Sequence, residues 1–355
     1  MIAVQAMLMR GGTSKGMYFL RSDLQETGQD LDTLLPMIMG SPDRRQIDGV
    51  GGGSTTTSKV AIVGPSTRPG CDIDYLFGQV DLDSMRVDWT PTCGNLLVGV
   101  GPYAVERGLV PAGDPLTTVR VNLVNTGARV ELTVRTPGGI VTYQGDHRIA
   151  GVPRRSAPVD VAFTEFVGGT TGRLHPTGRP VDVAGGIEFT GIDAAVCAVV
   201  ARAESFGLGG DENPADLDAD RRLGEAIEAM RLRAALQMGM GDVRGRVLPK
   251  VMLVSRSGSS AAVRSRYFVP IGCHPAHAVS GAIALSTAAA VGNTVVDSVL
   301  GGPQRAPLLI EHPAGVMEVD VALGTQGTPM RASLQRTARK LFDGTVFVDP
   351  TAMAS

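Results

Sequence analysis

Hydrophobic and polar residues alternate in short runs along the chain, and glycine, proline and aspartate separate these runs. Alternation with a period of two is typical of strands that bury one face. The pattern predicts strands at 2–9, 59–63, 72–80, 117–123, 129–135, 194–201, 247–254 and 265–269. Many strands with few helices indicate an α+β protein that is built largely on antiparallel sheet.

Three segments have helical patterns instead. The first opens at Cys93 and runs over 96–106, and the third runs over about 275–291. Both carry small or apolar residues on every face, which is typical of a helix buried inside a sheet. The second, over 214–238, is charged on one side and apolar on the other, and it follows an Asp-Glu-Asn-Pro start signal. We expect this amphipathic helix to pack on a sheet from outside.

The two small-residue helices indicate an internal repeat. Each follows a cysteine-containing turn, Cys93-Gly94-Asn95 and Cys273-His274-Pro275. The repeat predicts two similar domains, each a mostly antiparallel sheet wrapped around a central helix, with the active site in the cleft between them. A length of 355 residues agrees with two domains. A Pro- and Gly-rich stretch connects them, and we place the domains at 1–183, joined by a C-terminal strand at 329–355, and at 184–328.

Composition narrows the class of ligand. The 33 basic and 35 acidic residues are scattered, so no basic surface for nucleic acid is predicted. The four cysteines lie far apart without a CxxC pair, which argues against a zinc site and a disulfide framework and favours reduced, cytosolic thiols. They are Cys71, Cys93, Cys197 and Cys273. No signal pattern and no membrane-length apolar run is present, so we expect a cytoplasmic protein that acts on small molecules.

Cys93 is the strongest candidate for chemistry. At the start of a helix, the positive end of the helix dipole and unpaired backbone amides favour the thiolate. Such a thiol suits proton transfer, and the same amides attract a carboxylate. The alternative is a structural cysteine that fills a small hole in the core. Gly94 and Asn95 have no apolar bulk and leave room for a ligand beside the sulfur.

Two glycine-rich segments supply further candidates. Residues 9–16 lack the GxxxxGK[ST] spacing and precede no helix, which argues against a nucleotide, but such a turn can hold a carboxylate through backbone amides. Residues 48–58 lead into Lys59 at a strand start. Lys59 is either a solvated edge charge, which the residues alone favour, or a partly buried amine whose lowered pKa suits a base.

Two histidines and two arginines complete the set of candidates. His274 and His277 flank the start of the third helix, where the helix dipole favours neutral imidazole; helix capping is their ordinary role. Arg336 and Arg339 lie before a Phe342-Asp343-Gly344 turn. These arginines are surface charges by default, or clamps for a polycarboxylate.

Six motifs occur in a fixed order along the chain. They are MRGGTSKG (9–16), SPDRRQIDGVGG (41–52), TSK (57–59), CGN (93–95), HPAHAVSGA (274–282) and RTARKLFDG (336–344). Together they resemble the 4-oxalomesaconate tautomerase and 2-methylaconitate cis-trans isomerase family, whose members have the diaminopimelate epimerase fold. The resemblance implies a 1,3-proton shift that moves a C=C bond in a small polycarboxylate, without metal or cofactor.

The resemblance also assigns residues. Lys59 and Cys93 become the acid/base pair. The implied substrate-binding residues are Arg10, Gly11, Gly12, Thr13, Ser14, Gly52, Ser54, Ser58, Gly94, Asn95, His274, His277, Ser280 and Arg336. SPDRRQIDG without an inserted Gly-Lys looks more like the oxalomesaconate tautomerases, which implies a role in the breakdown of aromatic compounds such as gallate or protocatechuate. Thr92 departs from the family, where asparagine is usual before the cysteine.

Other functions stay open at this point. One alternative is a 2-methylaconitate or 3-methylitaconate isomerase, and another is a racemase or epimerase that needs Cys273 opposite Cys93. A carboxylate-binding accessory protein without turnover is the non-enzymatic alternative. We expect a small polycarboxylate as ligand and neither nucleic acid nor membrane as partner, and we allow for a homodimer.

Overall fold

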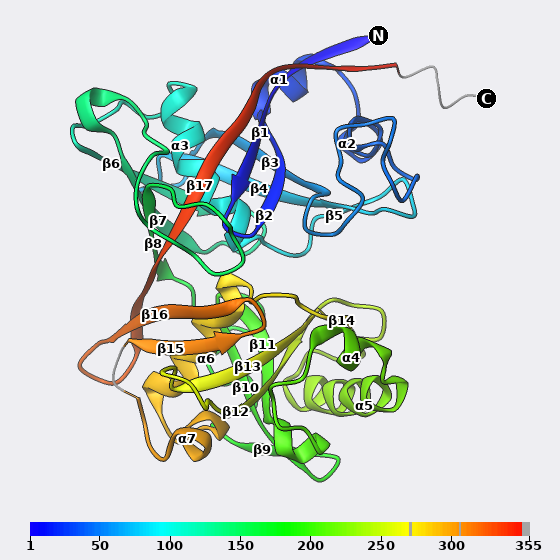
Figure 1. Cartoon of the computed structure of the whole chain (residues 1–355), viewed down its shortest axis with the longest axis vertical. Helices are drawn as coiled ribbons and strands as arrows, with labels where there is room; N and C mark the ends of the chain where they lie inside the picture. The colour runs from blue at the N-terminus through cyan, green and yellow to red at the C-terminus, as the bar shows by residue number, and fades with distance from the viewer. Residues whose placement is uncertain (270–271, 305–306, 350–355) are drawn as a thin grey trace. The chain divides into compact units, whose positions relative to one another are not determined.

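The computed structural model describes residues 1–269, 272–304 and 307–349 and divides the chain into two compact units (Figure 1). The first unit comprises Met1–Val161 and Gln335–Ser355, and the second comprises Ala162–Leu334. The first division falls inside the Pro- and Gly-rich stretch 151–186. That stretch also contains two strands that the sequence pattern did not indicate.

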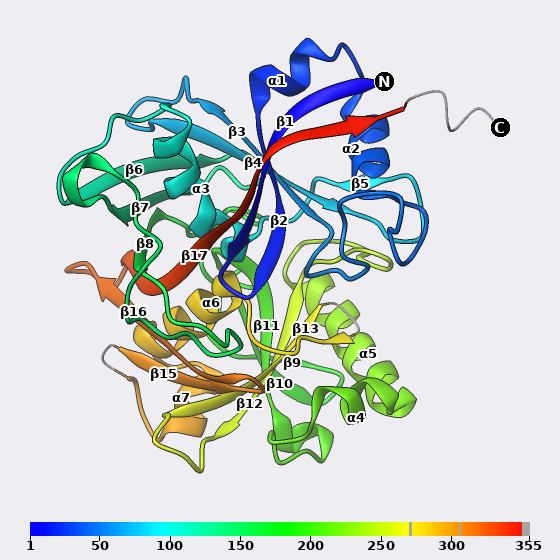
Figure 2. The ribbon, with the colours of Figure 1, turned by 45° about the horizontal axis from the view of Figure 1, so that its top comes forward.

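The first unit is a curved sheet around one helix. Its strands pair in the order β17–β1–β2–β3–β4–β6–β7, with β2–β3 and β4–β6 parallel and the other pairs antiparallel. The strands are β1 (Ile2–Gly11), β2 (Ser14–Leu20), β3 (Lys59–Pro65), β4 (Ile73–Val80), β5 (Val87–Asp88), β6 (Leu116–Leu123) and β7 (Arg129–Arg135). Two more strands, β8 (Pro158–Glu165) and β17 (Pro329–Val348), each cross the division between the units. β17 runs beside β1 (Figures 1 and 2). Helix α3 (Gly94–Glu106) contacts β1, β2, β3, β4, β6 and β7. The sheet therefore wraps around α3.

The second unit repeats this arrangement. Its strands are β9 (Asp182–Ala184), β10 (Ile187–Ala194), β11 (Val196–Arg202), β12 (Lys250–Arg256), β13 (Val263–Val269), β14 (Gly272–Cys273), β15 (Leu308–His312) and β16 (Gly315–Leu323). The order β10–β11–β12–β13–β15–β16 has the same sequence of antiparallel and parallel pairs as β1–β2–β3–β4–β6–β7. Helix α6 (Val279–Val291) contacts β10, β11, β15 and β16. The predicted fold class, two related sheets with a central helix each, is confirmed.

Small residues allow the two central helices to be enclosed. A Cβ at Gly99 in α3 would lie 2.5 Å from the hydroxyl oxygen of Tyr18, and one at Gly281 in α6 would lie 2.4 Å from the ring of Tyr267. Tyr18 lies on β2 and Tyr267 lies on β13, and both side chains are buried. A larger side chain at either glycine would push the helix away from its sheet.

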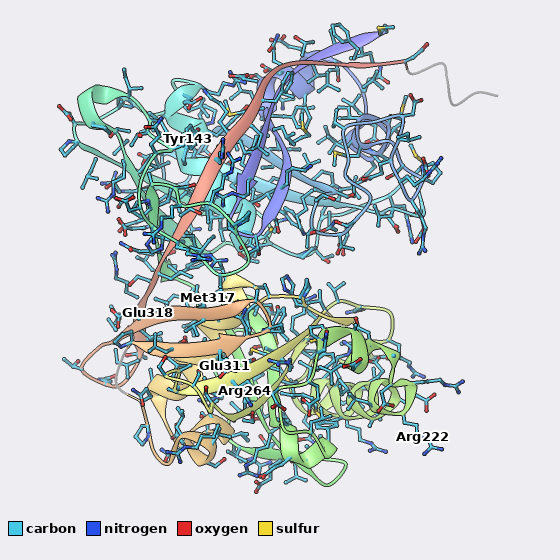
Figure 3. The ribbon with its side chains drawn as sticks, in the orientation of Figure 1. Tyr143, Arg222, Arg264, Glu311, Met317 and Glu318 are labelled. Atoms are coloured by element: carbon cyan, nitrogen blue, oxygen red, sulfur yellow. The ribbon has the colours of Figure 1, made fainter. Side chains whose placement is uncertain are left out.

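The remaining helices are α1 (Arg21–Glu26), α2 (Leu31–Met39), α4 (Pro214–Ala219), α5 (Arg221–Gln237), α7 (Val295–Leu300) and the short 3-10 helices η1 (Pro137–Gly139) and η2 (Ala203–Phe206). The predicted helix 214–238 is thus wrong as a single element. Asp220 is extended, and its carboxylate accepts a hydrogen bond from the amide of Leu223, so it caps a second helix. In α5, Leu223 and Ile227 are buried, whereas Arg222 points away from the sheet (Figure 3). The amphipathic pattern is confirmed.

Local hydrogen bonds also delay the start of the third predicted helix. The amide of Ala276 donates to Nδ1 of His274 at 2.9 Å, and Nδ1 of His277 donates to the carbonyl oxygen of Ala278 at 3.0 Å. Such side-chain bonds compete with a helical turn. The helix therefore begins at Val279 rather than near Pro275.

In the same unit, an ion pair between Arg264 and Glu311 at 2.9 Å links β13 to β15 (Figure 3). Of the helices described, none has the length and apolar character that a membrane crossing requires.

Candidate active site

Cys93 lies at the N-cap of α3 in the first unit. Its sulfur accepts a hydrogen bond from the amide of Leu96 at 3.5 Å, and the residue is 9% exposed. Gly94 and Asn95 form the first buried turn. The predicted helix and the place of the thiol at its start are therefore confirmed.

Lys59 is the first residue of β3, and the structure brings it near Cys93. Its Nζ donates a hydrogen bond to Oε1 of Gln79 at 2.5 Å and lies 5.1 Å from the ring centre of Phe77. Burial lowers the pKa of Lys59, and the negative charge that Cys93 carries when it is ionised acts in the opposite direction. The solvated edge charge that the residues alone favoured is wrong, because these neighbours take the amine out of water.

Three polar residues that the sequence did not point to hold this pair in place. Gln79 also donates from Nε2 to the carbonyl oxygen of Ser58 at 2.8 Å. The hydroxyl of Tyr75 donates to the carbonyl oxygen of Cys93 at 3.2 Å, and that of Tyr18 donates to the carbonyl oxygen of Leu96 at 2.5 Å. Burial and the charge of Cys93 raise the pKa of both tyrosines, so both remain donors. The only sequence signal is the alternation of Tyr75, Phe77 and Gln79 along β4.

The turn between β1 and β2 packs against the start of α3. Gly12 has a φ of 51°, and a Cβ there would lie 2.2 Å from Oδ1 of Asn95. A Cβ at Gly11 would lie 2.3 Å from the carbonyl oxygen of Asn95. Asn95 donates from Nδ2 to the hydroxyls of Thr13 at 3.1 Å and Ser14 at 3.4 Å. The glycines thus permit close approach to the helix.

Two of the backbone amides in this turn are not available to a carboxylate. The amide of Gly12 donates to the carbonyl oxygen of Thr337 at 2.9 Å, and the amide of Lys15 donates to the carbonyl oxygen of Thr56 at 3.0 Å. Both donors are already used within the protein. The side chains around the turn, rather than these two amides, are available to a ligand.

Two arginines next to this turn carry uncompensated charge. Arg336 is 2% exposed; it donates from Nη2 to Oδ1 of Asn95 at 3.4 Å, and its Nε has no partner among the described residues. Burial and the charge of Arg10 lower the pKa of Arg336 to about 10. Arg10 donates to the carbonyl oxygens of Gly12 and Thr337, both at 2.9 Å. Burial and the charge of Arg339 lower the pKa of Arg10 to about 10.

The second glycine-rich loop is organised by Gln46. Its Oε1 accepts hydrogen bonds from the hydroxyl of Ser58 at 2.6 Å and from the amide of Gly53 at 3.0 Å. Ser58 is fully buried, and the hydroxyl of Ser54 lies 2.9 Å from that of Thr57. Gly52 is exposed. Ser58 and Ser54 therefore support the loop that leads into Lys59.

The second unit holds the remaining predicted residues. His277 is fully buried, with Nε2 3.1 Å from the hydroxyl of Ser265 and its ring 4.9 Å from that of Tyr267. Ser280 is buried and hydrogen-bonds to Tyr267, and His274 is half-buried. The enclosed position of the His277 ring favours a packing role over ligand binding.

The second unit has no thiol at the start of its central helix, because Ala278 is the N-cap of α6. Cys273 lies in β14, and its amide donates to Oδ1 of Asp218 at 2.6 Å. Burial raises the pKa of Cys273 to about 12. The parallel that the sequence suggested between the two cysteine-containing turns therefore does not extend to the position of the sulfur.

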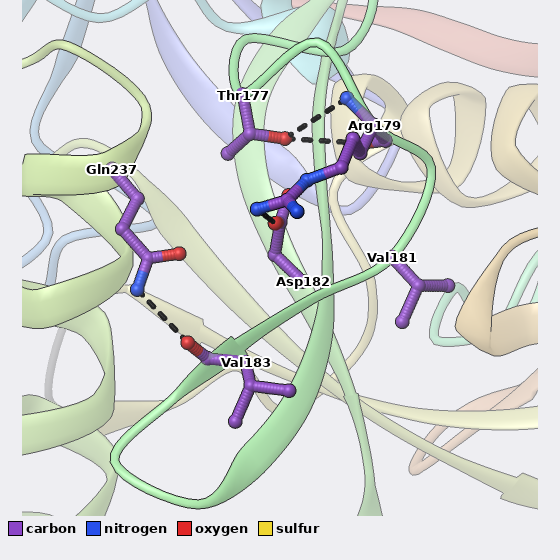
Figure 4. Close-up of a pocket in the computed structure, with 6 residues that line it drawn as sticks. All are labelled: Thr177, Arg179, Val181, Asp182, Val183 and Gln237. Atoms are coloured by element: carbon purple, nitrogen blue, oxygen red, sulfur yellow. Dashed lines mark hydrogen bonds and ion pairs between the residues drawn. The ribbon is translucent and has the colours of Figure 1, made fainter.

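A hollow in the second unit, of about 580 Å³, lies apart from these residues (Figure 4). It contains an ion pair between Arg179 and Asp182, and Gln237 donates from Nε2 to the carbonyl oxygen of Val183 at 2.9 Å. None of the predicted site residues lines it. Within the described parts of both units, no group of three or more His, Cys, Asp or Glu side chains is placed to hold a metal ion.

Comparison with known proteins identifies the family of the chain. The chain is 45% identical to the (4E)-oxalomesaconate Delta-isomerase of Novosphingobium sp. strain KA1, over 98% of each chain. It is 44% identical to the 4-oxalomesaconate tautomerase of Pseudomonas putida, over 97% of this chain and 96% of that one. The crystal structure of a methylitaconate-delta-isomerase superposes with a TM-score of 0.83 at 31% identity, over 98% of this chain and 95% of that one. Residues 1–349 match the family described as PrpF protein. The chain therefore belongs to the PrpF family of isomerases.

Proposed function

We propose that this isomerase moves a C=C double bond by a 1,3-proton shift in a small unsaturated polycarboxylate such as 4-oxalomesaconate, with protein side chains as the acid and the base. The observation that carries the proposal is the pairing of a half-buried amine, Lys59, with a thiol at a helix start, Cys93. Burial lowers the pKa of Lys59, which raises the share of neutral amine at neutral pH. The names of two relatives suggest the substrate.

In this mechanism Lys59 takes a proton from the carbon next to a carboxylate, or from its vinylogous position, and a dienolate forms. The negative charge of the dienolate spreads over carboxylate and enolate oxygens, so preformed positive groups stabilise it. Arg10 and Arg336 supply that charge, because neither has a carboxylate partner among the described residues. Cys93 gives its proton to the far end of the three-carbon unit. Proton transfer from the Lys59 ammonium to the thiolate then restores the starting state.

A methylitaconate or methylaconitate substrate is the second candidate. It is favoured by the superposition with methylitaconate-delta-isomerase and by 34% identity to the 2-methyl-aconitate isomerase of Shewanella oneidensis. Both candidates need the same proton transfers and differ in the number and position of carboxylates. A role in the breakdown of aromatic compounds follows only from the first.

The test is incubation of the purified protein with 4-oxalomesaconate, 2-methylaconitate and 3-methylitaconate. The conjugated chromophore reports isomerisation, and NMR in D₂O reports exchange at the reacting carbons. Lys59→Met should abolish exchange, and Cys93→Ser should lower turnover by about 10²- to 10⁴-fold, the range that general acid–base groups supply. Cys71→Ser is the matched control, because Cys71 is a half-buried thiol in the segment before β4 and is not at the start of a helix. Exchange at the wild-type rate in Lys59→Met would refute the assignment.

A further inference from the structure

Three cationic side chains stand in one row across the first sheet. In the antiparallel pairing of β1 with β2, Arg10 is opposite Lys15, and in the pairing of β1 with β17, Arg10 is opposite Arg339. Directly opposed residues on neighbouring strands project from the same face, and like charges in such pairs destabilise a sheet. Residues 10 and 339 are far apart in sequence, so this row exists only in the folded protein.

The row borders a hollow of about 390 Å³ in the first unit. Lys15, Arg10 and Arg339 line it together with Arg154, from a loop that precedes β8, and with Thr13 and Ser14. Among the described residues that line the hollow there is no carboxylate. Thr13 and Ser14 also accept hydrogen bonds from Asn95, two residues after Cys93. The hollow therefore adjoins the turn that packs on the helix of the acid/base pair.

The positive charge of this hollow is not neutralised within the described protein. Arg10 donates only to neutral oxygens, those of Gly12, Thr337 and Ser156. The side chains of Lys15, Arg154 and Arg339 form no hydrogen bond or ion pair with any described residue. Three partly buried arginines elsewhere in the first unit do have carboxylate partners: Arg21 with Asp74, Arg107 with Asp343 and Arg135 with Asp160. The contrast indicates an anionic ligand for the row.

We propose that Lys15, Arg339 and Arg154, next to Arg10, form a subsite for a carboxylate group remote from the double bond, which makes the enzyme selective for tricarboxylates over dicarboxylates. The assignment of this group to a substrate rests on the function proposed above. Guanidinium groups pair with carboxylates through two parallel hydrogen bonds, and two arginines with one lysine match a ligand of more than one negative charge. Lys15, Arg154 and Arg339 thereby determine specificity without touching the reacting carbons.

The test compares two saturated ligands that differ by one carboxylate, tricarballylate and glutarate, by isothermal titration calorimetry. The wild-type protein should bind tricarballylate more tightly. In Arg339→Gln and in Arg154→Gln, the affinity ratio of tricarballylate to glutarate should fall by about 10- to 100-fold, since each change removes charge-assisted hydrogen bonds to the extra carboxylate. Arg155→Gln is the control. Arg155 is the exposed neighbour of Arg154, does not line the hollow and bonds to the carbonyl oxygen of Asp146.

A second readout separates binding from folding. Removal of Arg339 relieves like-charge repulsion, so the melting temperature of ligand-free Arg339→Gln should equal or exceed that of the wild type, while its stabilisation by tricarballylate should be smaller. A ratio that matches the Arg155→Gln control would overturn the proposal, whatever the melting temperature. Both ligands lack a double bond, so the measurement is independent of turnover. An altered ratio without isomerisation of 4-oxalomesaconate would keep the subsite and refute the proposed reaction.

Discussion

Substitution of Gln79 by glutamate tests whether Lys59 acts as a neutral base. Oε1 of Gln79 accepts the hydrogen bond from Nζ of Lys59 at 2.5 Å, so glutamate would place a negative charge against the amine. Two unit charges about 4 Å apart interact by about 4 kcal/mol at an effective dielectric constant of about 20. That energy corresponds to about three pKa units, and burial of the new carboxylate offsets part of it, so we expect the pKa of Lys59 to rise by about one to three units.

A raised pKa has a defined consequence for the pH profile. A base must be neutral to accept a proton, so turnover rises with pH as the ammonium of Lys59 loses its proton. In Gln79→Glu, the acidic limb of the kcat/KM profile should move to higher pH by about one to three units, with turnover at pH 7 about 10- to 1,000-fold lower. At high pH, where Lys59 is neutral in every variant, the profile should approach that of the uncharged control variant, Gln79→Met.

The matched control is Gln79→Met, which adds no charge. Both variants lose the hydrogen bond from Nε2 of Gln79 to the carbonyl oxygen of Ser58, so the difference between them isolates the carboxylate. The methionine variant should keep its acidic limb at the wild-type position or at lower pH, because it removes an acceptor that favours the ammonium. Solvent deuterium exchange, measured from about pH 5 to about pH 10, provides both profiles. This range covers the pKa values that a lysine base can have when burial or a neighbouring charge shifts them. Superimposable limbs in the two variants would show that Lys59 is not the base.

Three further predictions concern the turn, the second unit and metal ions. Gly12→Ala should lower the free energy of unfolding by more than about 1 kcal/mol and reduce turnover, because the new Cβ would lie 2.2 Å from Oδ1 of Asn95. Gly28→Ala is the matched control, because Gly28 also has a positive φ, 65°, but its new Cβ would have nothing within 4 Å; equal melting temperatures of the two variants would contradict the prediction. Cys273→Ala should keep kcat/KM within about threefold of the wild type, because burial raises the pKa of Cys273 to about 12 and keeps it a thiol; a loss beyond about tenfold would favour a two-thiol racemase. EDTA should leave turnover unchanged, because in the proposed mechanism Lys59 and Cys93 supply the proton transfers; a loss that a divalent ion restores would refute the mechanism.

Local signals predicted the parts of the fold that depend on one segment. The small residues of α3 and α6 indicated enclosed helices, and most predicted strands correspond to β-strands within a few residues. β2 was missed because it begins in the Gly-Thr-Ser motif, which has the composition of a loop. The break at Asp220 was missed because aspartate is also tolerated inside a helix, and its role as a cap depends on the backbone conformation.

The site depends more on tertiary contacts. Cys93 was predictable because its helix cap is local. The residues around Lys59 predicted a surface charge, because its burial depends on Gln79 and Phe77 of the neighbouring strand. The row of Lys15, Arg10 and Arg339 requires the register of three strands, and no local pattern in the sequence contains that register. The residue types in the sequence indicated proton transfer and carboxylate binding. Which charged side chains lie next to each other depends on pairing between distant strands.

The repeat of the fold makes the difference in chemistry between the two units informative. The third strand of the repeat begins with a lysine in both units. Lys59 in β3 is half-buried, and Lys250 in β12 is buried. The cap of the central helix differs, because α3 has Cys93 where α6 has Ala278. A lysine at this strand start is therefore shared by both copies of the scaffold, whereas the thiol at the helix start belongs to one. In the proposed mechanism, one amine and one thiol of a single unit are the two proton-transfer groups. This asymmetry favours allylic isomerisation over exchange at one carbon between two equivalent thiols.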